Sequence, residues 1–433
     1  MNLTSENKNW RTPLFIRCFY GYMVSGMMVL VFGSILPDMI KEAGLSYILA
    51  GGLLSAMAIG NFSASFLFPV LVKYIGKRAS IIFVTALSPF LLFCITLLPP
   101  VWVMYVCLFL IGIGKGSITI FNNAIVNDYS KDPVKTLNYL HCSYAVGAFS
   151  APMLTGILLV FGCNWRVILY FILCLGITSC LFYASKNYNA LPSVTEDVSV
   201  TEDTPIMEDE RAKENRHKKG TSAADMAHKG SRNSVNYKSA ANSHAVFYKN
   251  FDFYCIALLL FFYTGLENCV NGWFVTYLQS MNIMSEALAS IMVSVTWICI
   301  MAGRLTCAAL SKKVARSLIV LCNCLGSAAG LFILITGSHM IQVVCGLILL
   351  GLFMSGIFPT SVAVARPFIK GSTNGMAFMT AISSIGGILA PQLVGMLADT
   401  FGISGGIALL LVNAVAMLLF SVIVQKRLFV KIE

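Results

Sequence analysis

Long apolar runs separated by short polar stretches dominate the pattern of this chain. Most of these runs have about 20 or more residues, and a helix of that length, rising about 1.5 Å per residue, crosses a hydrocarbon core of about 30 Å. We therefore predict an all-α integral membrane protein with twelve transmembrane helices. The expected spans are residues 14–37, 47–72, 79–98, 101–126, 138–160, 166–185, 252–278, 286–309, 317–336, 340–365, 373–397 and 403–425.

One segment interrupts the pattern. Seven acidic residues between Glu196 and Glu210 precede a stretch rich in Lys, Arg, Ser and Asn, which has too few apolar side chains to form a core. We predict a disordered linker at residues 187–249. It would join an N-terminal six-helix bundle at residues 1–186 to a C-terminal six-helix bundle at residues 250–433.

The two predicted bundles repeat each other in sequence. GAFSAPMLTGIL, from Gly147, matches GGILAPQLVGML, from Gly386, and the same ungapped shift of 239 residues pairs Gly33 with Gly272. Parallel repeats of this kind are found in transporters, whose substrate site lies at the repeat interface near the middle of the membrane. This register also allows the two halves to be compared position by position.

Composition agrees with a membrane protein and explains the net charge. The chain has 433 residues, of which 57% are hydrophobic and only 11% charged, against about 25% in soluble domains. A net charge of +11 suggests nucleic-acid binding, but the basic residues gather in alternate loops, as the positive-inside rule requires. We therefore expect a multi-pass protein of the cytoplasmic membrane, with both termini and the linker in the cytoplasm, lipid contacts, no nucleic-acid partner and a monomeric state. The predicted inside segments hold Lys8, Arg11, Lys73, Lys77, Arg78, Lys131, Lys135, Lys312, Lys313, Arg316, Arg366, Lys370, Lys426, Arg427 and Lys431, and the outside loops hold Lys41 and Arg166.

Two ionisable residues are predicted near the middle of the membrane. Lys115 lies in the span 101–126 and Glu267 in the span 252–278, and each costs about 2.5–3.5 kcal/mol at a helix centre on insertion scales. In the repeat register their counterparts are Met354 and Met28. Packing therefore does not demand a charge at either position, which favours a functional role.

Further polar residues share the helix faces of these two charges. Spacings of three, four, seven and eight residues place side chains on one side of a helix, and we predict that both polar faces line a cavity between the halves. Alternatively, Lys115 pairs permanently with Glu267, loses its proton, or extends toward the membrane surface. The predicted faces consist of Lys115, Thr119, Asn122 and Asn123 in the first helix, and Tyr263, Glu267, Asn271 and Phe274 in the second.

No motif predicts an enzyme, a cofactor or a metal site. GIGKGS lacks the order of a phosphate-binding loop, because Gly116 follows Lys115 where Ser or Thr is needed. Gly112 and Gly116 instead predict a close helix approach. Most of the fourteen cysteines lie in apolar spans without a CxxC pair, so we interpret them as packing residues.

Four stretches carry a resemblance to a known family: LNYLHCSYAVGAFSAP, FFYTGLENCVNGWFVTYL, GLFMSGIFPTSVAVA and GGILAPQLVGMLAD. In them the sequence resembles the fucose-permease-like branch of the major facilitator superfamily. The resemblance implies a sugar transporter driven by a proton or sodium gradient, with roles for Glu267, Asn123 and His141 in the site. We also expect Trp273 to be a substrate-binding residue. Independently of the resemblance, we expect the cytoplasmic loop KYIGKR, with Arg304 and Lys312, to act in gating; the loop residues are Lys73, Gly76, Lys77 and Arg78.

The sequence departs from that family at two places. Thr119 occupies the position of a frequent carboxylate, and Lys73 stands where an acidic residue is usual. From the resemblance and the position of the two mid-membrane charges, we predict proton-coupled sugar transport by alternating access, with Glu267 as the proton-responsive group. Three alternatives stay open: transport of an organic anion or sugar acid with Lys115 as counter-ion, an efflux carrier, and a membrane sensor that moves no solute.

Overall fold

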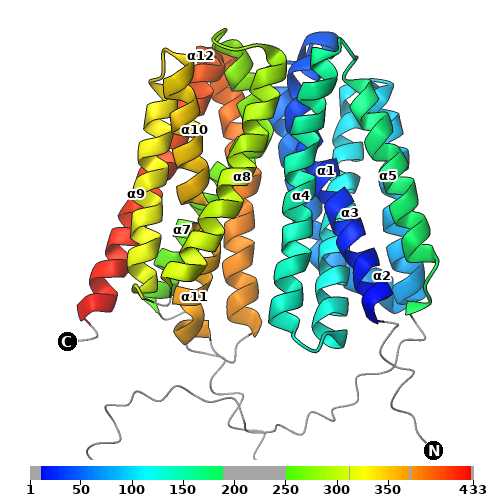
Figure 1. Ribbon diagram of the computed structural model, residues 1–433, viewed down its shortest axis with the longest axis horizontal. Helices are drawn as coiled ribbons and strands as arrows, with labels where there is room; N and C mark the ends of the chain where they lie inside the picture. The colour runs from blue at the N-terminus through cyan, green and yellow to red at the C-terminus, as the bar shows by residue number, and fades with distance from the viewer. Residues whose placement is uncertain (1–10, 189–249, 312, 370–372, 431–433) are drawn as a thin grey trace, which may run out of the picture.

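The computed structural model describes residues 11–188, 250–311, 313–369 and 373–430 (Figure 1). From residue 189 on, the predicted linker lies outside the described residues, as does Lys312. The described part is helical, with short loops and no strand. Its helices are α1 (Arg11–Ala43), α2 (Tyr47–Thr96), α3 (Val101–Tyr129), α4 (Pro133–Val160), α5 (Arg166–Ala184), α7 (Phe251–Ser280), α8 (Glu286–Leu310), α9 (Arg316–Ile335), α10 (Met340–Met354), α11 (Ile357–Ile369) and α12 (Thr373–Val430).

These helices confirm the predicted all-α membrane fold. Ten helical segments of the described chain are long and apolar enough to span a membrane. Two of them, α2 and α12, each contain two predicted spans, and their backbone leaves the helical conformation at Gly76 and Gly402. Both glycines have positive φ, 81° and 74°, which other residues adopt at a cost, so the chain reverses there and each long helix supplies two crossings.

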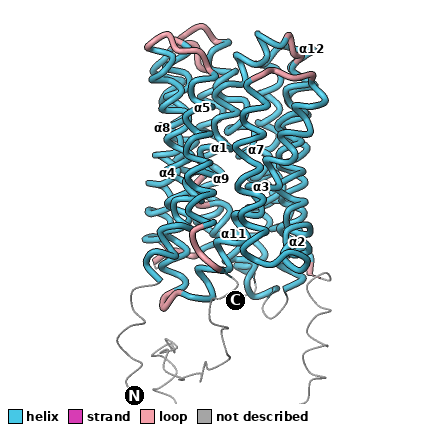
Figure 2. The backbone as a smooth tube through the Cα atoms, turned by 90° about the vertical axis from the view of Figure 1, so that its right-hand side faces the viewer, coloured by secondary structure: helices cyan, strands magenta, loops and turns pink. Residues whose placement is uncertain are grey.

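The helices stand roughly parallel in two bundles, with α1–α5 in one and α7–α12 in the other (Figures 1 and 2). We refer to them as the N-half and the C-half. α1 begins and α12 ends at the same end of the molecule, which we call the linker side; the loops after α1 and α7 lie at the opposite end, the far side (Figure 1). This arrangement places α4 and α8 against each other between the halves.

Corresponding helices of the two halves begin in the same way. The Ser46 hydroxyl accepts a hydrogen bond from the backbone N–H of Leu49 (3.3 Å) at the start of α2, and the Ser285 hydroxyl accepts one from Leu288 (3.2 Å) at the start of α8. Ser46 and Ser285 are paired by the 239-residue shift seen in the sequence. Serine at this position satisfies a backbone donor that the helix leaves free, so the repeat extends to helix capping.

The two halves are joined on the far side. Serine hydroxyls of α2 and α8 donate to backbone carbonyls of the opposite half, and small residues let the helices approach closely, as is usual between membrane helices. Near the linker-side start of α4, Tyr139 is 54% exposed. The hydrogen bonds between the halves include Ser55 Oγ to Ile388 O (2.7 Å), Ser290 Oγ to Pro152 O (2.9 Å), Ser294 Oγ to Phe149 O (2.8 Å) and Gln392 Nε2 to Ile48 O (3.3 Å).

An ion pair ties two helices of the N-half together on the far side. Glu42, in the last turn of α1 beyond the predicted span, accepts hydrogen bonds from the Arg166 guanidinium (2.6 and 2.9 Å) and from the Trp165 indole (2.8 Å). These donors, Arg166 first, hold the pKa of the Glu42 carboxyl below its ordinary value. The carboxylate therefore links α1 to the start of α5.

Candidate functional site

A cavity of about 180 Å³ lies between the halves. Lys115 is the fifteenth residue of the 29-residue α3, and Glu267 lies near the middle of the 30-residue α7, so the cavity is at mid-depth. Its walls come from α1, α2 and α3 of the N-half and from α7 and α12 of the C-half. The lining residues are Val29, Gly33, Leu54, Met57, Ala58, Asn61, Lys115, Thr264, Glu267, Asn268, Asn271, Gly272, Ser384 and Pro391.

Lys115 enters the cavity because its neighbours pack elsewhere. A Cβ atom on Gly112 would meet the Met57 carbonyl at 2.1 Å, and one on Gly116 would meet Ala64 at 2.5 Å, so the predicted small-residue face of α3 does pack against α2. Lys115 lies between these two contacts and lines the cavity. No carboxylate oxygen of the described residues lies within 4.0 Å of its ammonium nitrogen.

Glu267 lines the opposite wall, on the C-half. The hydroxyl of Tyr263, one helical turn away and 1% exposed, donates a hydrogen bond of 3.1 Å to the Glu267 carboxylate. Glu267 and Lys115 interact electrostatically across the cavity without forming a contact ion pair. The site therefore holds one cation and one anion, each carried by a different half.

Amide and hydroxyl groups surround this pair of charges. Asn271 Oδ1 is buried and has no hydrogen-bond partner among the described residues. Asn268 donates from Nδ2 to the Gly387 carbonyl (2.9 Å), and Thr264 shares a hydrogen bond with Ser383 (2.5 Å). A buried polar atom is normally paired. The unpaired oxygen of Asn271 is therefore an acceptor that a ligand in the cavity could use.

The prediction that Asn122 faces the cavity is wrong. Asn122 is 0% exposed, donates to the Cys18 carbonyl (3.2 Å) and accepts from the Tyr183 hydroxyl (2.9 Å). Both partners belong to the N-half, since Cys18 is on α1 and Tyr183 is on α5. The linker-side part of α1 covers the face of α3 that Lys115 shares with Asn122, so only the middle of that face is open to the cavity.

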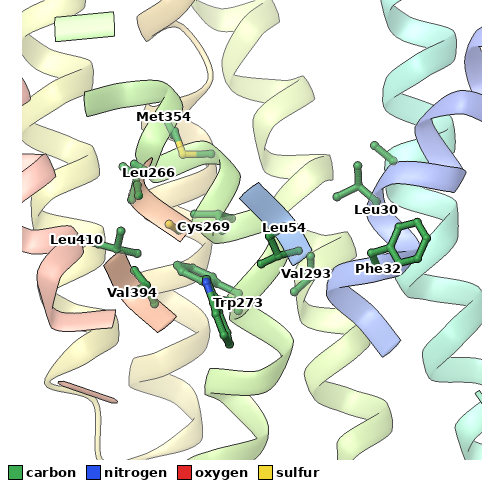
Figure 3. Packing of buried hydrophobic residues seen from close by; sticks show 14 of the residues in the cluster. Leu30, Phe32, Leu54, Leu266, Cys269, Trp273, Val293, Met354, Val394 and Leu410 are labelled. Atoms are coloured by element: carbon green, nitrogen blue, oxygen red, sulfur yellow. The ribbon is translucent and has the colours of Figure 1, made fainter. Parts of the chain in front are cut away.

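Trp273, predicted to bind the solute, does not line the cavity. Its side chain is 0% exposed within the apolar core (Figure 3), and its indole donates to the Pro391 carbonyl (3.0 Å). Pro391 itself lines the cavity. Trp273 therefore supports one wall from behind and does not line it.

Three further predicted residues lie away from the cavity lining. Thr119 donates to the Lys115 carbonyl (2.9 Å), and Asn123 keeps a buried Oδ1 without a partner among the described residues. The His141 side chain is exposed on the linker side, with its ring 5.6 Å from that of Tyr22. Thr119 and Asn123 lie on α3 between Lys115 and its linker-side end, and His141 lies near the linker-side start of α4.

The predicted gating residues differ in their surroundings. Arg304, half-buried on α8, interacts electrostatically with His141 of the N-half and approaches the Tyr263 hydroxyl. Lys73 and Lys77 are exposed on the linker side, and Arg78 donates to the Ala184 carbonyl (2.8 Å) at the end of α5. Arg304 thus belongs to the interface, between the cavity and the linker side.

Four polar lining residues were not predicted: Asn61, Thr264, Asn268 and Ser384. Small polar residues are common between membrane helices, where they bond to neighbouring backbone, so their type alone gives no signal. Thr264 and Asn268 lie next to Tyr263 and Glu267 in sequence, and this proximity was the available signal.

Comparisons with known proteins agree with this architecture. Residues 18–284, more than half of the chain, match the model of the Major Facilitator Superfamily. The chain is 22% identical over 416 residues to "Bypass of stop codon protein 6" of Saccharomyces cerevisiae, covering 90% of this chain and 77% of that protein. Its fold is similar to that of a D-xylose-proton symporter (TM-score 0.71, 12% identity, 96% and 97% of the two chains). It is also similar to the nucleoside transporter NupG (TM-score 0.69, 15% identity, 96% and 98%). The two helical bundles, the cavity between them and the family match lead to one assignment: the chain belongs to the Major Facilitator Superfamily of membrane transporters.

Proposed function

We propose that this protein is a secondary active transporter that moves one small polar solute, a monosaccharide or a solute of similar size, in symport with a proton. The observation that supports this proposal is the mid-depth cavity that the two halves share, with Lys115 on one wall and Glu267 on the other. In transporters built from repeats, substrate and coupling ion bind at such an interface. Charged groups at this depth are costly and therefore mark transport sites.

The size of the cavity favours a solute with a single ring. Its volume of about 180 Å³ is below the roughly 300–1,000 Å³ of sites for drug-sized ligands, and slightly above a cavity of about 150 Å³ that admits benzene. A monosaccharide fits this size better than a nucleoside, which has a base in addition to its sugar. The similarity in fold to a D-xylose-proton symporter agrees with this choice.

The chemistry of the lining favours a hydroxylated solute. Hydroxyl groups both donate and accept hydrogen bonds, and the unused Asn271 Oδ1 is an acceptor for one of them. Asn61 and Ser384 add further polar groups, whereas Met57, Leu54 and Pro391 supply an apolar surface for a ring face.

The contacts between the halves support alternating access. Hydrogen bonds join the halves on the far side, so the cavity is closed there. The basic residues of the linker side support a cytoplasmic position for that side and for both termini. With this orientation, the protein is inward-facing, and transport requires the far-side contacts to break while the linker side closes.

Glu267 is the group that we propose to carry the proton. It is the only carboxylate among the lining residues that the structure describes, and the Tyr263 hydroxyl donates a hydrogen bond to it. A protonated Glu267 leaves the cavity with the single charge of Lys115, and an ionised Glu267 balances that charge. Binding of a proton therefore changes the electrostatic environment of the solute.

Transport into proteoliposomes under an imposed pH gradient tests this proposal. With radiolabelled D-xylose, D-galactose and their acids as the panel, we expect uptake that depends on pH in the wild type and is insensitive to pH in Glu267→Gln. Glu286→Gln, an exposed change in the first turn of α8, is the matched control and should keep the pH dependence. A pH response retained in Glu267→Gln would remove Glu267 from the coupling mechanism.

A further inference from the structure

Resting on the proposed function, we infer that the transported solute is a small hydroxylated monoanion, such as a sugar acid, whose carboxylate binds the ammonium group of Lys115. The inference concerns the substrate class of the cavity between the halves. It depends on three observations: the balance of charge at the interface, the lack of a carboxylate of the described residues within 4.0 Å of the Lys115 nitrogen, and the repeat position that Lys115 occupies.

The charges that face the interface are predominantly positive. Lys115 and Arg304 are cations and Glu267 is the anion. The other titratable groups that interact with Arg304 are His141, Tyr22, Tyr144 and Tyr263. Among the described lining residues, α1, α2 and α12 contribute no charged side chain to the cavity. With Glu267 protonated, Lys115 is the one charged group among the described lining residues, and a monoanion neutralises its charge whereas a neutral sugar leaves it uncompensated.

Lys115 has its ammonium group available for a ligand. No carboxylate oxygen of the described residues lies within 4.0 Å of the Lys115 nitrogen, and Glu267 is engaged by the Tyr263 hydroxyl. An ammonium group at mid-depth needs a counter-charge. A carboxylate supplied by the solute provides one and adds a charge-assisted hydrogen bond.

The fold does not require the charge of Lys115. Its repeat counterpart, Met354, is 0% exposed in the apolar core of the C-half, so an unbranched apolar side chain serves at the equivalent place. The charge is therefore a feature of the cavity. Lys115→Met replaces the residue with the one that the other half already carries, which makes it a suitable test of the charge alone.

These positions give a direct link between proton and anion. When Glu267 holds a proton, Lys115 is the only charged group among the described lining residues and binds the solute carboxylate. When Glu267 releases that proton, its carboxylate competes for Lys115 and favours release of the anion, toward the side where Arg304 lies. Each cycle moves one proton and one anion, so it is electroneutral.

Paired solutes that differ in one functional group test the inference. We would measure binding to purified protein by thermal shift, since a ligand of the folded state raises its melting temperature, and uptake into proteoliposomes. The pairs are D-galactose with D-galacturonate and D-xylose with D-xylonate. The proteins are the wild type, Lys115→Met, Lys115→Arg and, as a control, Lys131→Met in an exposed linker-side loop.

We expect an acid to bind and move in preference to its neutral partner in the wild type and in Lys131→Met. Lys115→Met should weaken binding of the acid by about 10- to 100-fold, the usual range for a lost charge-assisted hydrogen bond, and Lys115→Arg should retain the preference for the acid. Uptake of a neutral sugar without competition from its acid would overturn the inference and leave the proposed function intact. No uptake of either class by folded protein would overturn both.

Discussion

On the far side of the interface, the Asp399 carboxylate of α12 is hydrogen-bonded to the start of α2. Its two carboxylate oxygens accept hydrogen bonds from the backbone N–H groups of Tyr47 (2.7 Å) and Ile48 (3.0 Å). These donors are among those that a helix leaves free at its N-terminus, where the helix dipole also favours a negative charge. Opening the far side separates the two helices, so Asp399 should stabilise only the far-side closed state.

Asp399→Asn keeps one acceptor oxygen, but it loses the second acceptor and the charge. Loss of one hydrogen bond costs about 0.5–1.5 kcal/mol, and loss of the charge at an exposed helix N-terminus costs about 0.3–1 kcal/mol. We therefore expect the far-side closed state to lose about 1–2 kcal/mol relative to the open state. This corresponds to about a 5- to 30-fold increase in the open population.

Labelling of a cavity cysteine measures that population. Ala58 lines the cavity, so Ala58→Cys reports access when an impermeant maleimide is added on the far side of cells that carry the protein. Labelling of the same protein without Ala58→Cys gives the background from native cysteines. The labelling rate of Ala58→Cys should rise about 5- to 30-fold when Asp399→Asn is added.

Asp132 provides a matched control. Its carboxylate accepts a hydrogen bond from the Lys135 N–H (3.0 Å) and caps α4 within its own half, on the linker side. Asp132→Asn makes the same chemical change at a helix start without touching the interface, and it should leave far-side labelling unchanged. If Asp399→Asn labels at the rate of the Asp132→Asn control, the far-side role of Asp399 is refuted.

Three further outcomes follow from the packing. Asn122→Ala should lower the melting temperature, because it leaves the buried Tyr183 hydroxyl unpaired at a cost of about 1–3 kcal/mol. Solute affinity should stay unchanged. Altered affinity at an unchanged melting temperature would show that Asn122 contacts the solute. Gly33→Ala places a Cβ atom 1.9 Å from the Asn271 carbonyl of the other half. Overpacking of about 1–3 kcal/mol should slow proteoliposome uptake about tenfold. The control Gly114→Ala meets a rotatable hydroxyl inside the N-half and should not slow uptake, and equal uptake in the two variants would contradict this reasoning. Because the pKa of Glu42 is lowered in the folded protein, its stabilising effect is present above the ordinary value of 4.5 and lost as the pH falls through the folded pKa. Glu42→Gln should thus melt at a lower temperature than the wild type at neutral pH, with a difference that shrinks in acid; a difference independent of pH would argue against the ion pair.

The hydrophobic pattern predicted the fold closely because each membrane-spanning helix must contain its own apolar run. The predicted span 166–185, for example, is found as α5, Arg166–Ala184. Apolar runs do not encode the backbone at the reversals, where α2 and α12 each appear as one long element broken at Gly76 and Gly402. Both glycines adopt a positive φ, and the pattern of apolar residues carries no information on this backbone angle.

The candidate site could be predicted in part. Charged side chains are rare inside a membrane because placing them there costs free energy. For this reason Lys115 and Glu267 could be identified from the sequence, and both line the cavity. Periodicity places residues on one face of a helix, but it does not say which neighbour covers each part of that face. The crossing of α1 over α3 decides this, and it buries Asn122 while leaving Lys115 open.

The repeat suggests why the charges lie where they do. Met28 and Met354, the counterparts of Glu267 and Lys115, are both buried in apolar surroundings, and the Met28 methyl group packs where a Cβ atom on Gly176 would lie. Each half therefore shows that its helix can carry an unbranched apolar side chain at this position without loss of the fold. A charge replaces that side chain once in each half, on a different helix of the repeat and with opposite sign, so that the cavity receives one cation and one anion. We infer that the packed scaffold comes from the residues that the halves share, and that the chemistry of the solute site comes from the positions at which they differ. Lys115→Met and Glu267→Met should therefore remove transport while preserving the fold.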